Sequence, residues 1–183
     1  MKKKIAIIGL GYVGLPLAVE FAKQYEVMGF DVDQSRIEEL KKNHDSTFEI
    51  KDDIVLLVRD NLDFTSNIND TKDCSIYIVS VPTPIDKFNN PDLKPLITSS
   101  QTVGTVIKKD DIIIYESTVY PGVTEDVCVK ELEKSSGLKF NQDFFCGYSP
   151  ERVNPGDKIN TLTKIRKITS GSTPEIAREV DEL

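Results

Sequence analysis

The sequence predicts an α/β protein built on a doubly wound, mainly parallel sheet with helices on both faces. Two observations predict this class. Short apolar runs of strand length alternate along the chain with segments whose apolar residues recur every three or four positions. The first apolar run also ends in a glycine-rich turn that leads directly into an amphipathic segment, as in the first strand, turn and helix of a βαβ unit. In such sheets, ligands bind at the carboxyl ends of the strands.

The predicted elements follow in order along the chain. Apolar and β-branched runs indicate strands at residues 4–8, 27–31, 62–65, 75–81, 111–116, 144–147 and 165–170. Helical spacing of apolar residues indicates helices at residues 12–24, 34–42, 51–59, 93–107 and 123–134. Because helices separate most of the strands, we expect parallel crossover connections. The loops that follow the strands are therefore the first places to look for functional side chains.

The turn after the first strand has the spacing Gly9-x-Gly11-x-x-Gly14. In a Rossmann-like unit the first glycine allows the tight turn, the second lets the backbone approach a pyrophosphate, and the third lets the helix pack closely on the sheet. The N–H groups at the start of that helix would hold the phosphates. Asp31 ends the next apolar run 22 positions after Gly9, near the spacing of about 20 expected for the acid that binds the adenosine ribose. Together these features predict a dinucleotide site; the alternative is a glycine turn in another kind of βαβ unit.

Length and composition limit the other classes of function. The 183 residues, 39% of them apolar, suit one α/β domain with a buried core. The net charge is −7 and no basic stripe follows residues 2–4, so we expect no nucleic-acid partner. No apolar stretch approaches the roughly 20 residues of a membrane span, and the N-terminus lacks a signal-peptide pattern, so we expect no membrane partner. Cys74, Cys128 and Cys146 have no metal-ligand spacing, which predicts no metal site and a reducing, cytoplasmic location.

Three loops after predicted strands, residues 79–86, 116–122 and 147–157, carry distinctive side chains. In the first, two prolines restrict the backbone on either side of Thr83, although such a residue taken alone is more often part of a plain turn than a cofactor contact. The second places Ser117 and Thr118 next to a carboxylate at a strand end, where a helix cap is the alternative. The third offers Glu151 and Arg152, and an isolated pair of this kind is usually a solvated salt bridge of little energetic worth.

Five motifs occur in order: Gly-Leu-Gly-Tyr-Val-Gly-Leu-Pro-Leu-Ala (9–18), Gly-Phe-Asp-Val-Asp-x-x-Arg-Ile (29–37), Val-Pro-Thr-Pro (81–84), Glu-Ser-Thr-Val-Tyr-Pro-Gly (116–122) and Ser-Pro-Glu-Arg-x-Asn-Pro-Gly-Asp-Lys (149–158). Together they resemble the motifs of the nucleotide-sugar 6-dehydrogenases, the UDP-glucose/GDP-mannose dehydrogenase family. The last motif is similar to the branch that acts on UDP-N-acetylglucosamine or UDP-N-acetylgalactosamine for surface-polysaccharide synthesis. UDP-glucose dehydrogenases tend to carry a second glutamate where this chain has Pro155.

The resemblance implies oxidation of the C6 hydroxyl of a UDP-sugar substrate to a carboxylate, with two NAD+ used in turn. An aldehyde would be captured by a cysteine thiolate, oxidised to a thioester and hydrolysed. By motif position, Thr118 would hydrogen-bond the water or the C6 oxygen. Glu151 would be the base, or would position the water, for hydrolysis. A carboxylate within hydrogen-bond reach of a water suits this step.

The same resemblance assigns the cofactor contacts. Asp31 and Arg36 would hold the adenosine end of NAD, while Thr83 and Ser117 would line its path. Asp31 and nearby Asp33 would repel a 2′-phosphate, which favours NAD over NADP. The cofactor-binding set that we predict is Gly9, Gly11, Tyr12, Val13, Gly14, Asp31, Arg36, Thr83, Ser117 and Thr118.

We predict an NAD-binding Rossmann domain at residues 1–171, followed at 172–183 by the start of a helix, capped by Thr173, that leads toward central and C-terminal domains. In the family the nucleophilic cysteine lies in those domains, and none of the three cysteines here matches its motif. We therefore expect the 183 residues alone to be inactive, and a homo-oligomer to form through the central region. The alternatives are a UDP-glucose or GDP-mannose 6-dehydrogenase, a dehydrogenase of the 6-phosphogluconate or hydroxyacyl type, and a stand-alone NAD-binding module.

Overall fold

The structure is a computed structural model that describes residues 3–85, 87–152 and 164–183. Its centre is a seven-stranded sheet in the order β3-β2-β1-β4-β5-β6-β7. All neighbours are parallel except β7, which runs antiparallel to β6. The strands, in chain order, are β1 (Lys4–Ile8), β2 (Glu26–Phe30), β3 (Leu62–Thr65), β4 (Ile76–Val79), β5 (Asp111–Tyr115), β6 (Phe144–Tyr148) and β7 (Ser170–Gly171). This order is that of a doubly wound Rossmann-like sheet, as predicted.

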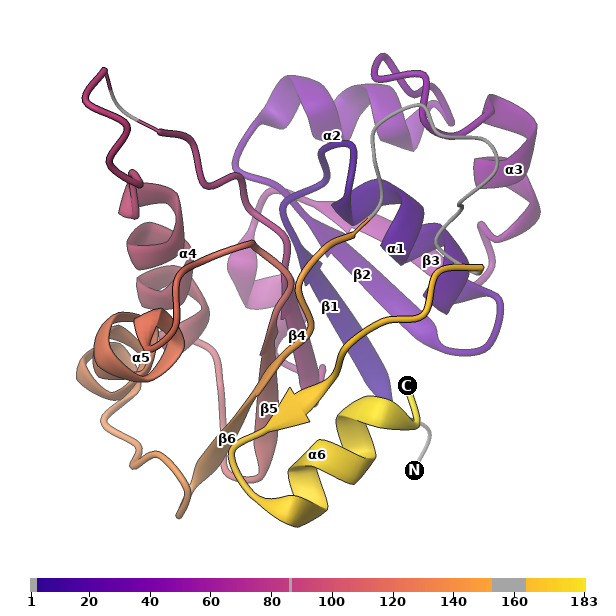
Figure 1. The fold of residues 1–183 in the computed structure, drawn as a ribbon. Coiled ribbons are helices and arrows are strands. Elements are labelled where there is room, and N and C mark those ends of the chain that lie inside the picture. Colours follow the sequence, from indigo (N-terminus) through magenta and orange to yellow (C-terminus); the bar gives the residue numbers. More distant parts are fainter. Residues whose placement is uncertain (1–2, 86, 153–163) are drawn as a thin grey trace.

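Helices cover both faces of the sheet. In Figure 1, α4 and α5 lie on one side of the strands and α1, α2 and α3 on the other. The helices are α1 (Gly14–Ala22), α2 (Gln34–Lys41), α3 (Asp52–Leu57), α4 (Lys94–Gly104), α5 (Val129–Ser136) and α6 (Pro174–Asp181), with a short 3₁₀ turn η1 (Ile68–Thr71) and a π-helical turn η2 (Thr124–Cys128). The five predicted helices are confirmed, with ends that differ by a few residues.

The alternation of side chains along β1 explains the two layers. Ile5 and Ile7 join the core under α1, α2, α3 and α6, whereas Ala6 and Ile8 join the core under α4 and α5. All four side chains are buried, because successive residues of a strand point to opposite faces and both faces are covered. A strand buried on both faces reads as a continuous apolar run, which is why the sequence located it so closely.

The predicted strand at residues 165–170 is wrong over most of its length. Only Ser170 and Gly171 pair with β6, and the residues before them form a turn and an irregular segment. Ile168 is 57% exposed, so its apolar side chain marks no buried face. The pairing stops where α6 begins, because Gly171 lies directly against that helix: a Cβ on this residue would lie 2.3 Å from the backbone nitrogen of Ala177.

Helix α6 packs back onto the sheet. Thr173 caps it, as predicted, by accepting a hydrogen bond from the N–H of Ile176 at 3.3 Å, and Pro174 is the first residue of the helix. Ile176 and Val180 bury their side chains in the same core as α1. The domain boundary at residue 171 stays a prediction. Within the described ranges, no helix is both long and apolar enough to cross a membrane.

Candidate functional site

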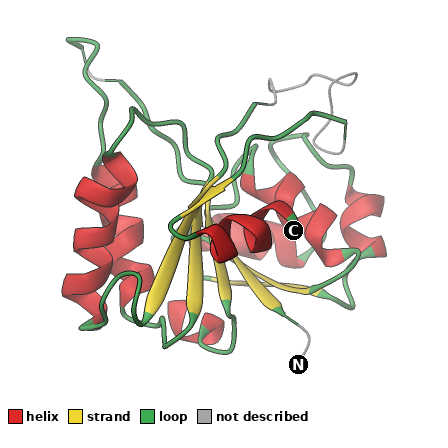
Figure 2. Cartoon of the chain, turned by 60° about the horizontal axis from the view of Figure 1, so that its bottom comes forward, coloured by secondary structure: helices red, strands yellow, loops and turns green. Residues whose placement is uncertain are grey.

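A cleft of about 790 Å³ opens at the carboxyl ends of the strands. The loops that follow the strands extend beyond this end of the sheet (Figure 2). The cleft lies where the strand order reverses, between β1 and β4, which is the expected place for a ligand in such a sheet. Its wall brings together nine of the predicted site residues, namely Gly9, Gly11, Tyr12, Val13, Asp31, Thr83, Ser117, Thr118 and Glu151.

The glycine turn between β1 and α1 has the geometry that its spacing predicts. Gly9 has a φ of +92°, a conformation that side chains disfavour. Gly14 lies behind the turn rather than in the cleft, because a Cβ there would lie 1.8 Å from the carbonyl oxygen of Gly9. Gly11 faces open space, with nothing within 4 Å of the position of a Cβ. The turn therefore leaves room for a ligand at Gly11 and none for a side chain at Gly14.

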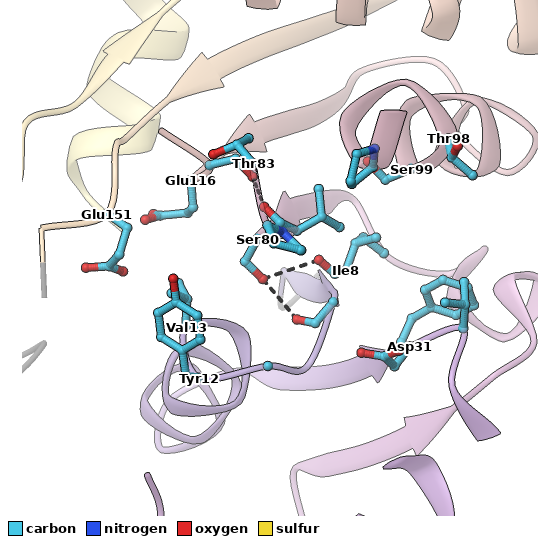
Figure 3. A pocket seen from close by; sticks show the side chains of 18 of the residues that line it. Ile8, Tyr12, Val13, Asp31, Ser80, Thr83, Thr98, Ser99, Glu116 and Glu151 are labelled. Carbon is cyan, nitrogen blue, oxygen red and sulfur yellow. Dashed lines mark hydrogen bonds between the residues drawn. The ribbon is translucent and has the colours of Figure 1, made fainter. Parts of the chain in front are cut away.

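The start of α1 is suited to an anion. No side chain caps this helix, whereas Asp33 caps α2 and Thr173 caps α6. The first N–H groups of a helix have no partners within it and carry a partial positive charge. Tyr12 and Val13, which come directly before α1, line the cleft (Figure 3), so the helix begins at the cleft. A phosphate or pyrophosphate fits this helix start.

Asp31 directly follows β2 and lines the cleft (Figure 3). One carboxylate oxygen accepts the N–H of Leu10 at 2.8 Å and the other accepts the N–H of Asp33 at 2.9 Å. These bonds hold the carboxylate at the rim of the cleft and leave each oxygen a further lone pair for a hydroxyl donor. The position suits a ribose, as predicted.

Arg36 takes a different place from the other predicted cofactor residues. It is buried in α2 behind the glycine turn, and its Nε donates to the carbonyl of Leu10 at 2.9 Å. Its guanidinium also pairs with Glu39 and lies 2.8 Å from the carboxylate of Asp45. Arg36 is not among the residues that line the cleft. Its contacts in this structure support the turn that carries Gly9 and Gly11.

Two hydroxyls join the loops after β4 and β5. Ser117 donates to the carbonyl of Val81 at 2.6 Å, and Thr83 donates to the carbonyl of Thr118 at 2.9 Å. Both predicted hydroxyls thus lie in the cleft wall, and both are engaged with backbone oxygens. Ser80, which the sequence did not single out, makes a similar bond to the glycine turn: it donates to the carbonyl of Gly9 at 2.9 Å.

Two carboxyl groups lie near each other at one end of the cleft. Glu116 follows β5 and Glu151 follows β6, and both side chains appear on the same wall in Figure 3. Burial raises the pKa of Glu116 above its usual value, and the ion pair with Lys167 opposes that rise. The charge of Glu151 raises the pKa of Glu116 further. The sequence predicted the role of Glu151 but not the burial of Glu116, because Lys167 lies 51 positions away. Residues 86 and 153–157 of the predicted loops lie outside the described residues.

The three cysteines lie within the protein core. Cys74, Cys128 and Cys146 are free thiols with buried side chains. Burial raises the pKa of Cys74 to about 11 and holds the pKa values of Cys128 and Cys146 above the usual range. The thiolate is the nucleophilic form of cysteine, so these environments disfavour nucleophilic chemistry. Across the described part of the chain, no cluster of acidic, cysteine or histidine side chains has the makings of a metal site.

The uncapped helix start, the open glycine turn and the carboxylate after β2 define a class of protein, the dinucleotide-binding Rossmann domains of dehydrogenases. Comparison with known families identifies one family within this class. The chain belongs to the UDP-glucose/GDP-mannose dehydrogenase family, whose NAD binding domain matches residues 3–183. The residues present thus fit NAD: the turn and α1 its pyrophosphate, and Asp31 its adenosine ribose.

Individual relatives agree with the family. The chain is 59% identical over 180 residues to a UDP-N-acetyl-D-glucosamine 6-dehydrogenase of Pseudomonas aeruginosa, covering 98% of this chain and 42% of the relative. It is 53% identical over 183 residues to Protein CapL of Staphylococcus aureus, covering 100% of this chain and 43% of CapL. A solved structure of UDP-D-ManNAc dehydrogenase from Pyrococcus horikoshii superposes with a TM-score of 0.87 at 32% identity, covering 98% of this chain and 43% of that one. The chain spans about two fifths of the length of these relatives.

Proposed function

We propose that this chain is the cofactor-binding part of an enzyme that oxidises the C6 hydroxyl of a UDP-N-acetylhexosamine to the carboxylate, using two NAD+ in turn. The observation that carries the proposal is the placement of Thr118 and Glu151 in one cleft with the dinucleotide turn. The 59% identity to a UDP-N-acetyl-D-glucosamine 6-dehydrogenase supports this substrate class over UDP-glucose or GDP-mannose. Bound NAD+ supplies the hydride acceptor for both oxidations.

The chain's own residues would orient the reactants. The N–H groups at the start of α1 and the carboxylate of Asp31 would hold the two ends of the cofactor's adenosine diphosphate portion. Thr83, whose hydroxyl is engaged with the carbonyl of Thr118, would keep the loop after β5 in place. The hydroxyl of Thr118 would then bind the substrate's C6 oxygen or the attacking water.

Glu151 would act in the hydrolytic half of the reaction. A thioester on a cysteine outside these 183 residues would be attacked by a water, and Glu151 would accept the proton from that water as the new C–O bond forms. The C–S bond would then break, which releases the sugar acid and returns the cysteine thiolate. A carboxylate close to such a water removes the need for free hydroxide. We do not assign the role of nucleophile to Cys74, Cys128 or Cys146, because all three thiols are buried.

The test is Glu151→Gln in the full-length protein. The amide keeps the shape and cannot take up the proton, so we expect NAD binding and the oxidation steps to persist while release of the acid slows by roughly 100- to 10,000-fold. A covalent sugar–enzyme adduct should then accumulate and be visible by intact-protein mass spectrometry. Turnover near the wild-type rate, or loss of NAD binding without an adduct, would remove Glu151 from this role.

The substrate and setting are parts of the same proposal. Product analysis of the full-length protein against UDP-N-acetylglucosamine, UDP-N-acetylgalactosamine, UDP-glucose and GDP-mannose would decide the sugar. We place the enzyme in surface-polysaccharide synthesis because its Ser-Pro-Glu-Arg motif resembles that branch. Three free thiols suit a reducing cytoplasm. We also propose a homo-oligomer, for which light scattering of the full-length protein is the measurement.

A further inference from the structure

Glu116 occupies an unusual place in the wall of the cleft. Its side chain borders the large cleft and also a second cavity of about 400 Å³, which is lined by α1, α6 and the segment that contains Lys167. The carboxylate is buried, with 6% of the side chain exposed, and the ammonium of Lys167 binds it. Lys167 is itself mostly buried, with 22% of its side chain exposed. This is therefore a desolvated ion pair, in contrast to the exposed pairs on the surface.

Glu116 is connected to Glu151 in two ways. The backbone N–H of Glu151 donates to the carbonyl of Glu116 at 3.0 Å, which continues the β5–β6 ladder and fixes the start of the loop that carries Glu151. The two carboxyl groups also interact through their charges, since Glu151 raises the pKa of Glu116. Other ionisable groups around the pair include Tyr12, whose ring points toward the two carboxyl groups in Figure 3, and Arg152, next to Glu151 in the chain. On the side of the second cavity, Glu20, Tyr25 and Asp181 line the same space as Glu116 and Lys167.

We propose that Glu116 and Lys167 are a positioning pair for Glu151: Lys167 holds the Glu116 carboxylate in the cleft wall, and Glu116 sets the backbone position and the local charge at Glu151. The inference deepens the role given to Glu151 under the proposed function and rests on it. A buried carboxylate in a cleft, matched to one specific cation, is the arrangement by which proteins adjust a neighbouring acid or base. Packing alone would not require a charged pair here, because burying an ion pair costs desolvation that an apolar pair avoids.

The first test needs no activity. Carboxyl-carbon NMR of the 183-residue chain follows the titration of Glu116 directly. Glu151→Gln removes the repulsive charge, so the pKa of Glu116 should fall; Lys167→Met removes the cation, so it should rise. Lys108→Met is the matched control, because Lys108 pairs with the buried Asp111 at the opposite end of the same strand, and it should leave the Glu116 titration unchanged. An unchanged Glu116 titration in Glu151→Gln would overturn the proposal.

The second test uses the full-length enzyme and the acid limb of its kcat profile. Glu116→Gln leaves the charge of Lys167 uncompensated, which favours ionised Glu151, so the limb should move to lower pH. The double variant Glu116→Gln/Lys167→Met restores a neutral pair and should return the limb toward the wild-type position. A pair that only stabilises the fold would lower yield or stability without this shift and reversal, and that result would overturn the proposal.

If Lys167→Met does not fold, Lys167→Arg keeps the cation and should retain the wild-type Glu116 titration, while Glu116→Gln still carries the kinetic test.

Two outcomes separate this inference from the proposed function. If the full-length protein oxidises no UDP-sugar but the Glu116 titration responds as expected, the proposed function fails and the coupling of the two carboxyls stands. If oxidation proceeds and the titration does not respond, the coupling fails and the function stands.

Discussion

The hydroxyl of Ser80, at the carboxyl end of β4, donates to the carbonyl of Gly9, at the carboxyl end of β1, across 2.9 Å. The two residues are 71 positions apart in the chain. The bond spans the point at which the strand order reverses, and it fixes the glycine turn against the neighbouring loop. A side chain that the sequence gives no reason to select thus helps to hold the phosphate-facing backbone in place.

Replacing Ser80 with alanine removes its hydrogen bonds to the carbonyls of Ile8 and Gly9 and should weaken cofactor binding as well as the fold. We expect a loss of about 1 kcal/mol in the free energy of unfolding, together with weaker NADH binding measured by fluorescence titration. Ser136→Ala is the control, because the Ser136 hydroxyl makes a similar bond to the carbonyl of Leu132, and neither residue lines the cleft. Equal NADH affinity in Ser80→Ala and the wild type would contradict this reading of the bond.

Gly11 and Gly14 should respond in opposite ways to an added methyl group. Gly14→Ala places a Cβ 1.8 Å from the Gly9 carbonyl oxygen and should cost roughly 3 kcal/mol of stability. Gly11→Ala meets nothing within 4 Å in the protein, so the melting temperature should barely change, while NAD affinity falls because the methyl occupies the cofactor's approach. Calorimetric binding and thermal unfolding of both variants measure the contrast. Similar melting temperatures for the two would show that the turn relaxes.

Asp31 should set the preference for NAD over NADP. Its carboxylate is held at the rim of the cleft by the N–H groups of Leu10 and Asp33, where a 2′-phosphate would meet its negative charge. Wild-type protein should bind NAD+ more tightly than NADP+ in isothermal titration, and Asp31→Ala should reduce that preference. Equal or tighter binding of NADP+ by the wild type would refute the assignment.

Asp45 should contribute stability that depends on pH. Burial opposes its ionisation, but hydrogen bonds from Thr47, Ile50 and Arg36 outweigh burial and hold its pKa below the usual 3.8. The contribution should be fully present above about pH 4 and should be lost as the pH falls through the lower pKa of the folded state. Asp45→Asn breaks the buried pair with Arg36 and should cost about 3 kcal/mol at pH 7.

The measurement for Asp45 is urea unfolding at pH 7 and at pH 3. The difference between Asp45→Asn and the wild type should shrink at the lower pH, because there the unfolded state takes up a proton at Asp45 more readily than the folded state does. Glu175→Gln serves as the control, since Glu175 and its partner Arg178 are both largely exposed and the change should stay within about 0.5 kcal/mol. A difference that is the same at both pH values would mean that ionisation of Asp45 is not what stabilises the loop.

The 183-residue chain alone should bind NAD and oxidise no UDP-sugar. Its three thiols are buried, and burial raises their pKa values, so none presents a thiolate to a substrate. NADH absorbance after incubation with UDP-N-acetylglucosamine and NAD+ is the measurement. NADH formation that Cys74→Ser, Cys128→Ser or Cys146→Ser abolishes would mean that one of these residues is the nucleophile.

Most of the fold was readable from the sequence because its signals are local. β1 and β3 match the predicted bounds, since an apolar run between turn residues reports its own burial. The strand predicted at residues 165–170 was wrong because contacts with distant residues decide the conformation of this segment. Lys167 forms an ion pair with Glu116, and α6 packs directly against Gly171. Tertiary contacts of this kind override a local apolar pattern.

The site divides in the same way. Gly9, Gly11 and Asp31 were found by spacing, because the chemistry of a dinucleotide fixes the distances between them along the chain. Glu116 and Ser80 were missed as functional side chains, since a serine or glutamate at a strand end has many ordinary uses. What distinguishes Glu116 is its burial beside Lys167. No spacing rule joins positions that meet only after the sheet has formed.

The paired bonds between the loops after β4 and β5 have a mechanical consequence. Ser117 donates from the loop after β5 to the loop after β4, and Thr83 donates from the loop after β4 to the loop after β5. The two loops are therefore tied at two points, and neither can move away from the other without breaking a hydrogen bond. We expect this side of the cleft to move as one unit, so a displacement of Val81 should be accompanied by a displacement of Thr118.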